Sequence, residues 1–226
     1  MAAPSVKKQN AILWLERTGL SLITREKSAL LRLSFTPDVI DHMEVVDGLK
    51  LQNLIHTFAT QNSLGPLSVS VVLAPDILFE KEWILSQSTD QTAEEQQFLD
   101  SVPFEHLIQG QWIKDNKKKL AVVNGNLITQ LKECFEKEGW LLTTVAPYFV
   151  VYGPTWNDQI AKDALKKMDS FKHENMFEKQ ISQEQLSPET APNQDSRNRS
   201  LLPILISVFA FLAVVLIIVL VKNAAH

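Results

Sequence analysis

The sequence predicts an α/β fold with a mixed β-sheet and flanking helices, followed by one C-terminal transmembrane helix. Short apolar or β-branched segments alternate with polar or glycine-containing breaks, which is typical of strands. Other segments repeat their apolar residues at helical spacing. Residues 201–221 contain no charged side chain. A helix of that length would span about 31 Å, close to the roughly 30 Å hydrocarbon core of a bilayer.

The N-terminal half is expected to be rich in strands. Turns at Thr18-Gly19 and Glu26-Lys27 would separate three of them, at residues 11–15, 20–24 and 29–35. Asp47 is the expected N-cap of a helix whose apolar positions are Leu49, Leu51, Leu54, Ile55 and Phe58. After Gly65-Pro66, strands at residues 67–73 and 78–85 would be joined by a turn at Pro75-Asp76.

The second half alternates helices and strands. A polar helix, capped by Thr89 or Thr92, should end before Val102-Pro103. Strands at residues 107–113 and 120–123 predict a hairpin whose turn carries Lys117, Lys118 and Lys119. A helix should then open at Asn124 or Asn126 and close at Gly139. Strand character at residues 140–145 and 148–152 would precede an amphipathic helix at residues 155–171, containing Trp156, Ile160, Leu165 and Met168.

Four segments are expected along the chain: a cytoplasmic domain at residues 1–171, a linker at 172–200, the membrane helix at 201–221 and a tail at 222–226. The linker is mostly polar and cannot bury enough apolar surface to fold alone. As a coil it would hold the domain about 30 Å from the bilayer. The residues that define the expected anchor are Leu201, Pro203, Phe209, Phe211 and Val221.

The orientation of the span follows from its flanking basic residues. Arg197 and Arg199 precede it and only Lys222 follows it, which predicts a cytoplasmic N-terminal domain. No secretory leader pattern opens the sequence. Ser207 and Ala210 give at most a small-residue patch, so a homodimer through the span stays open. The chain is expected to be a single-pass membrane protein, and the bacterial inner membrane is its favoured location.

Composition argues against several classes of function. The formal net charge of −4 argues against nucleic-acid binding. The single cysteine, Cys134, cannot form an intramolecular disulfide, and in a helical pattern it is expected to be a packed, unreactive thiol. Four of the five histidines are scattered along the chain before the uncharged run and are expected to be surface or capping residues; they are His42, His56, His106 and His173.

No cofactor, metal or catalytic site is predicted. An acidic patch made of Asp38, Asp41, Glu44 and Asp47 lacks the central glycine of a calcium loop and is interpreted as a solvated loop. The glycine-rich phosphate loops and the G-x-S-x-G elbow are also absent from the sequence.

Several motifs together resemble a known family. Residues 71–76, Val-Val-Leu-Ala-Pro-Asp, are followed by Phe79-Glu80-Lys81, and residues 98–104 would form a helix ending in Pro103-Phe104. A strand, a helix and a further strand ending in Pro147 come next. This order is similar to the actin-like domains of the type IV pilus protein PilM and the type II secretion protein GspL, over roughly residues 10–153. The resemblance implies actin-like, RNase H-like lobes.

The chain departs from the nucleotide-binding members of that group. Those members carry an Asp-x-Gly turn between their first two strands, whereas Glu16 and Gly19 stand here, and there is no room for a second phosphate-binding lobe. The resemblance therefore implies a non-catalytic scaffold that links an assembly ATPase or platform proteins to the inner membrane. Two alternatives stay open: a generic tail-anchored adaptor, and a degenerate nucleotide-binding enzyme that uses Glu16.

The expected partners are proteins of a membrane assembly complex and, through the C-terminal helix, the lipid bilayer. The candidate contact surface is a sheet edge or groove within residues 67–85. The tryptophans Trp83, Trp112, Trp140 and Trp156 could include an interface anchor, although at least two are expected to be buried in the core.

Overall fold

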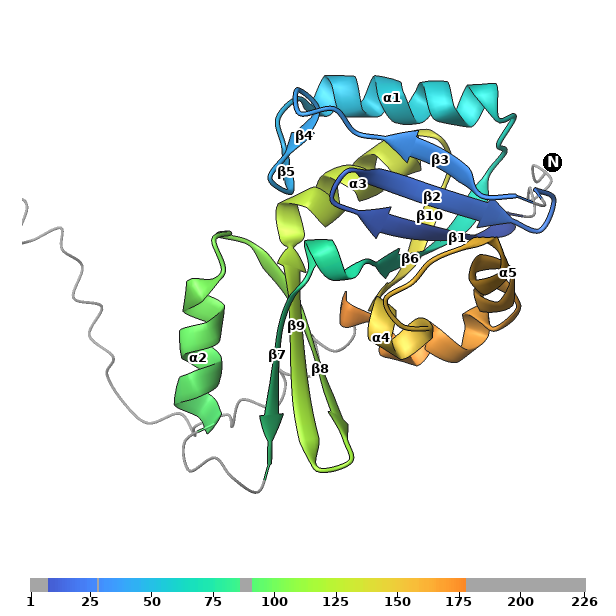
Figure 1. The fold of residues 1–226 in the computed structure, drawn as a ribbon. Helices are drawn as coiled ribbons and strands as arrows, with labels where there is room; N and C mark the ends of the chain where they lie inside the picture. Colours follow the sequence, from blue (N-terminus) through green and yellow to red (C-terminus); the bar gives the residue numbers. More distant parts are fainter. Residues whose placement is uncertain (1–7, 28, 86–90, 178–226) are drawn as a thin grey trace, which may run out of the picture. The chain divides into compact units, whose positions relative to one another are not determined.

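The computed structural model describes residues 8–27, 29–85 and 91–177. Its largest element is a five-stranded mixed sheet in the order β10-β6-β1-β2-β3 (Figure 1). Strands β1, β2 and β3 are antiparallel neighbours, and β6 and β10 run parallel to β1. The bounds of these strands are Gln9–Glu16, Gly19–Thr24, Leu31–Ser34, Leu67–Leu73 and Leu141–Pro147, in chain order.

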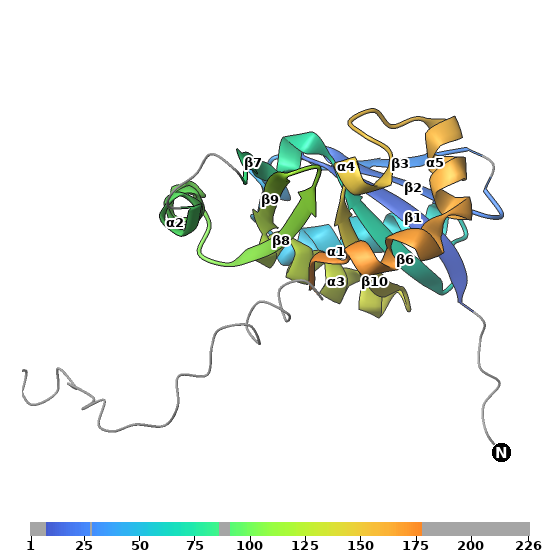
Figure 2. The ribbon, with the colours of Figure 1, turned by 90° about the horizontal axis from the view of Figure 1, so that it is seen from below.

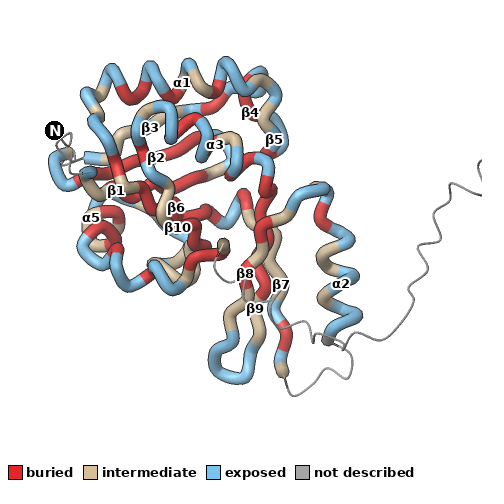
Figure 3. Tube along the Cα trace, turned by 180° about the vertical axis from the view of Figure 1, so that it is seen from behind, coloured by how far each residue is buried: buried red, intermediate tan, exposed pale blue. Residues whose placement is uncertain are grey.

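Helices cover both faces of this sheet, which explains its almost continuous apolar strands. On β1, Leu13 and Leu15 pack into a core with helices α1 (Gly48–Gln61) and α3 (Gly125–Lys137). Ile12 and Trp14 alternate with them and pack on the other face with α5 (Asp158–Lys166). Figure 3 shows β1 and β2 buried along much of their length.

A second sheet has three antiparallel strands in the order β7-β9-β8. These strands are Phe79–Ile84, Lys117–Asn124 and Leu107–Lys114, in sheet order. Helix α2 (Gln91–Ser101) packs on one face, where Phe98 and Leu99 contact the cluster around Trp83 and Leu120. Figures 1 and 2 both show α2 beside this sheet and away from the five-stranded one. The β8–β9 tip is exposed (Figure 3).

The predicted N-caps of α1 and α3 and the predicted end of α3 are confirmed. Asp47 accepts hydrogen bonds from the backbone N–H groups of Leu49 and Lys50, both at 3.0 Å. Asn124 caps α3 through the N–H of Asn126 at 2.9 Å. Gly139 follows α3 with φ of +74°, a conformation that glycine adopts without strain. The mixed five-stranded sheet and the helices that cover it confirm the α/β class predicted from the sequence.

Two predicted turns are wrong in position. The β1–β2 turn consists of Arg17 and Thr18, because Gly19 is already paired with Glu16. The β8–β9 turn consists of Asp115 and Asn116, which have φ of +49° and +59°. Such positive values at both central positions match the twist of a two-residue hairpin. Residues 117–119 are therefore part of β9 and do not form a lysine-rich turn.

The C-terminal part of the domain also differs from the prediction. Residues 148–152 are not a strand, because Tyr148–Val151 form the short helix α4 directly after Pro147. The expected helix at residues 155–171 is divided into α5 and a 3₁₀ helix, η2 (Met168–Glu174), and Trp156 lies before both. Buried side chains continue to Asn175 and Met176. The fold thus extends past the boundary predicted at residue 171.

Two further short strands were not predicted. Strands β4 (Ile40–Asp41) and β5 (Glu44–Val45) form a small hairpin within the acidic segment that precedes α1. Within the described residues, no helix is both long and apolar enough to cross a membrane. The predicted anchor at residues 201–221 and most of the predicted linker lie outside the described residues, as do Arg197, Arg199 and Lys222.

Candidate functional site

The turn between β1 and β2 is the place where the sequence resemblance led us to look for a phosphate site. The backbone N–H of Arg17 donates to a carboxylate oxygen of Asp76 at 3.1 Å. Asp76 belongs to η1 (Pro75–Ile77), the 3₁₀ turn after β6. The N–H of Ala74 also donates to the carbonyl oxygen of Leu15 at 2.9 Å. These two bonds hold the turn against the end of β6.

Gly19 has a structural role beside this turn. A Cβ added to Gly19 would lie 2.3 Å from the carbonyl oxygen of Leu33 on β3. The lack of a side chain at Gly19 therefore allows β2 and β3 to pair, and this packing explains the glycine without a ligand.

The chemistry of the turn disfavours an anion. Phosphate-binding loops offer free backbone N–H groups and positive potential. Here the Arg17 N–H is already bonded to the Asp76 carboxylate. A phosphate would have to displace that carboxylate and would then lie beside its negative charge. In the part of the chain that the structure describes, no group of three or more His, Cys, Asp or Glu side chains could hold a metal ion.

The acidic patch predicted before α1 is used for local structure. Asp47 caps α1, and Asp38 forms an ion pair of 2.8 Å with Lys50. The hydrogen bond from Lys50 lowers the pKa of Asp38 to about 2. Asp41 and Glu44 face each other across the β4–β5 hairpin. The four carboxylates therefore do not converge on one point.

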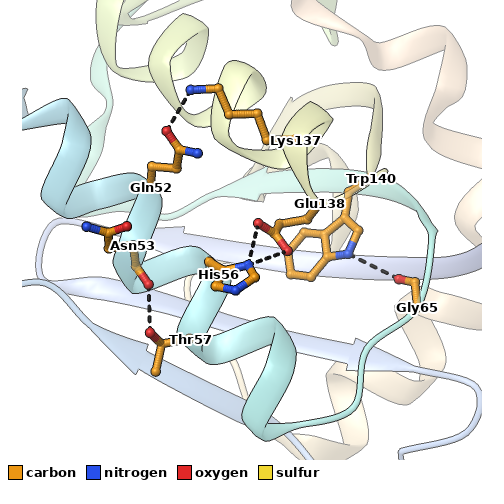
Figure 4. A network of polar contacts seen from close by, with 8 residues as sticks. All are labelled: Gln52, Asn53, His56, Thr57, Gly65, Lys137, Glu138 and Trp140. Carbon is orange, nitrogen blue, oxygen red and sulfur yellow. Dashed lines mark hydrogen bonds and ion pairs between the residues drawn. The ribbon is translucent and has the colours of Figure 1, made fainter.

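The predicted surface or capping histidines are found in separate places. His56 on α1 contacts the Glu138 carboxylate, with Nδ1 lying 3.1 Å from one oxygen and 3.2 Å from the other (Figure 4). His42 lies 3.8 Å from Asp41, and its side chain is exposed. The carbonyl oxygen of His106 accepts from the N–H of Gly125 at 2.8 Å.

Figure 4 shows two more contacts around α3. Lys137 donates to the Gln52 amide oxygen at 2.6 Å, which joins α3 to α1. The indole of Trp140 donates to the carbonyl oxygen of Gly65 at 3.1 Å. Cys134 lies in α3 and is buried, as predicted, and burial raises the pKa of its thiol. These contacts are structural and bring no reactive pair together.

The face of the three-stranded sheet opposite α2 carries charged pairs and aromatic rings. Lys117 pairs with Glu82 at 2.7 Å, and Lys119 pairs with Glu80. Lys119 also lies 4.0 Å from the centre of the Phe149 ring on α4. The remaining lysine, Lys118, points to the other face and pairs with Glu95 of α2. Alternation along β9 thus divides the lysine run between two faces.

The tryptophans separate into buried and partly exposed residues. Trp140 and Trp83 are buried in the core, as predicted for at least two of the four. Trp112 packs edge-on against Phe149 and donates to Glu174 at 2.5 Å. Trp112 and Phe149 also line an open pocket of about 570 Å³. Trp156 stacks on Trp14, with ring centres 4.8 Å apart.

The predicted contact surface, residues 67–85, is divided by the structure. Strand β6 lies between β1 and β10 in the middle of the sheet, so it offers no edge. Strand β7 pairs only with β9 among the described residues, and it is therefore an edge strand. Sequence reasoning missed Asp76 as the partner of the turn, although its position after Pro75 marked a tight bend.

Comparisons with known proteins return neighbours in structure alone. No protein-family profile and no curated protein sequence matches the chain. A structure of the PilM-PilN type IV pilus biogenesis complex is 13% identical with a TM-score of 0.43, over 63% of this chain and 47% of that one. The cytoplasmic domain of EpsL, an inner-membrane component of the type II secretion system of Vibrio cholerae, is 11% identical with a TM-score of 0.42, over 65% of this chain and 60% of that one.

A third neighbour is a Bacteroides thetaiotaomicron protein with an actin-like ATPase fold and unknown function. It is 16% identical with a TM-score of 0.32, over 61% of this chain and 52% of that one. The chain thus matches between 47% and 60% of the length of these three proteins. The first two are a pilus and a type II secretion component, and the third has an actin-like fold, which are the kinds of protein that the sequence resembles. The likeness concerns the backbone of part of the chain and identifies no ligand, partner or activity.

Proposed function

We propose that this protein is a non-catalytic, membrane-anchored scaffold that links cytoplasmic components to an inner-membrane pilus or secretion assembly platform. The observation that carries the proposal is the closure of the β1–β2 turn by Asp76. A carboxylate occupies the backbone donor that a phosphate would need, and Gly19 is required for packing against β3. These contacts give the turn a structural role and leave protein binding as the favoured function.

The contact surface in this proposal is the edge of β7 that pairs with no other strand among the described residues. An unpaired edge strand can accept an extended segment of a partner through backbone hydrogen bonds. Ile84 at the end of β7 is 42% exposed, which offers an apolar contact beside that edge. Glu80 and Glu82 are engaged by lysines of β9, so β7 does not present unpaired charges at these positions. The edge thus suits a peptide-like segment of a platform or ATPase protein.

The membrane anchor in this proposal is the uncharged run at residues 201–221, with Arg197 and Arg199 on the cytoplasmic side. The test is cross-linking of the full-length protein in its native cells, followed by detergent purification and identification of partners by mass spectrometry. Recovery of an assembly ATPase or platform proteins is expected. Recovery of none would contradict the scaffold.

A matched pair of variants locates the contact. Ile84→Asp should remove the cross-linked partner, because it places a charge beside the β7 edge. Leu141→Asp is the control, since Leu141 is 45% exposed and also lies in a strand. Equal recovery of partner with both variants would exclude the β7 edge. Magnesium-dependent ATP binding to the purified full-length protein would overturn the non-catalytic assignment.

A further inference from the structure

A basic pocket lies between the end of β2 and α5, outside the surfaces described above. It has a volume of about 580 Å³. We call it the basic pocket, and its lining consists of Thr24, Arg25, Lys27, Gln159, Lys162, Leu165 and Lys166. No carboxylate is among these residues. The lining therefore gathers four cations on a chain whose formal net charge is −4, although the Asp163 carboxylate bonds to both Gln159 and Lys166.

Local structure brings the cations together. Lys162 and Lys166 lie four residues apart on α5, and Gln159 lies three residues before Lys162, so all three share one face of the helix. Asn157 caps this helix through the N–H of Ile160 at 3.0 Å. Opposite them, the Thr24 hydroxyl accepts from the N–H of Lys27 at 3.3 Å, which fixes the bend that carries Arg25 and Lys27.

The charges of the pocket are only partly neutralised. Lys166 pairs with Asp163 at 3.1 Å. The hydrogen bond and charge of Lys172 lower the pKa of Asp169, and Arg25 adds to this effect without forming an ion pair with that carboxylate. Within the described residues, Arg25, Lys27 and Lys162 form no ion pair, whereas the three lysines of β9 are all paired with glutamates. An adjoining pocket shares Arg25 and adds Lys8, with Glu26 as its one acid.

We infer that the basic pocket docks the domain on an anionic lipid surface by binding headgroup phosphates. Each Lys or Arg near such a surface adds a favourable interaction that falls off within a Debye length. No aromatic side chain lines the pocket, which disfavours stacking of nucleic-acid bases. The inference rests on the proposed membrane anchor, because a tether would hold the domain about 30 Å from the bilayer and make docking an intramolecular event.

The test uses the full-length protein reconstituted into vesicles. A dye on a new cysteine at the exposed Thr155 position reports energy transfer to an acceptor-labelled lipid, since native Cys134 is only 4% exposed and resists labelling. Transfer is compared between phosphatidylcholine vesicles and vesicles that also contain phosphatidylglycerol. Wild type should dock on the anionic vesicles alone, and added salt should reverse docking.

The decisive variant is Arg25→Gln with Lys162→Gln. Removing two charges should lower the ratio of docked to free domain about 30-fold. The control is Lys114→Gln with Lys132→Gln, on β8 and α3, which removes the same charge from outside the basic pocket. Equal transfer in both lipids, or equal losses in both double variants, would overturn the inference.

Membrane anchoring is tested separately from docking by an alkaline wash of the vesicles. A chain that washes off the vesicles at alkaline pH would contradict the proposed anchoring. The same chain is then mixed with phosphatidylglycerol vesicles and sedimented. Salt-sensitive binding that the Arg25 and Lys162 variant loses, and that the control variant keeps, would support the pocket without the anchor. No difference between the variants would overturn it.

Discussion

Replacement of Gly19 by alanine tests whether this glycine serves packing or a ligand. The added Cβ would lie 2.3 Å from the Leu33 carbonyl oxygen, about 0.7 Å inside the 3.0 Å approach that real Cβ atoms respect. The obstacle is backbone, so β2 and β3 must separate where Gly19 faces Ser34. Overpacking costs about 1–3 kcal/mol, and a lost ladder hydrogen bond costs about 1 kcal/mol more. The free energy of unfolding should therefore fall by about 2–4 kcal/mol.

The measurement is urea unfolding of the full-length protein in detergent, followed by tryptophan fluorescence. Gly65→Ala is the matched control, because no atom lies within 4 Å of a Cβ added to Gly65. The bond from Trp140 to the Gly65 carbonyl oxygen also survives that change. The control should alter stability by no more than about 1 kcal/mol. A Gly19→Ala protein as stable as the control would refute the packing argument.

Two other predictions concern polar contacts of the same domain. Asn124→Ala removes the cap of α3 and the 3.0 Å hydrogen bond from the Asn124 amide to the buried carbonyl oxygen of Met43. The free energy of unfolding measured in urea should therefore fall by about 2–4 kcal/mol. A fall of less than about 1 kcal/mol would show that Asn124 has neither role. The pKa of Asp38 is lowered from 3.8 to about 2 by Lys50, so its ion pair should stabilise the fold above pH 4 and lose that effect as the pH falls through 2. Comparison of wild type with Lys50→Met by acid unfolding checks the sign, and a gap between them that widens towards pH 2 would contradict it.

Features with a local physical signature were predictable from the sequence. Asp47 and Asn124 accept from the first free N–H groups of their helices. Such an N-cap can be predicted from the residue type and from the helical spacing of the apolar residues that follow it. Gly139 takes a positive φ just after the C-cap Glu138 of α3, a conformation that glycine adopts most readily. Strands β2 and β6 of the central sheet were predictable because both of their faces are buried along nearly their whole length.

Features that depend on distant residues were not predictable. Lys117 to Lys119 looked like a solvated turn, yet each has a glutamate partner that folding brings from β7 or α2. Residues 148–151 have the composition of a strand, but they form α4, where Phe149 meets Trp112 of β8 and Lys119 of β9. The basic pocket was missed because its cations come from segments more than a hundred residues apart.

The short η1 turn connects the two halves of the proposed function. It ends β6 at the centre of the large sheet, and Leu78 after it leads directly into β7. In the same turn the Asp76 carboxylate accepts from the Arg17 N–H, which is the contact on which the proposed non-catalytic role rests. Pro75 favours the tight geometry because its φ is fixed near the helical value. One segment therefore bonds to the β1–β2 turn and leads into β7, so the closed turn and the contact surface of the proposed scaffold depend on the same local structure.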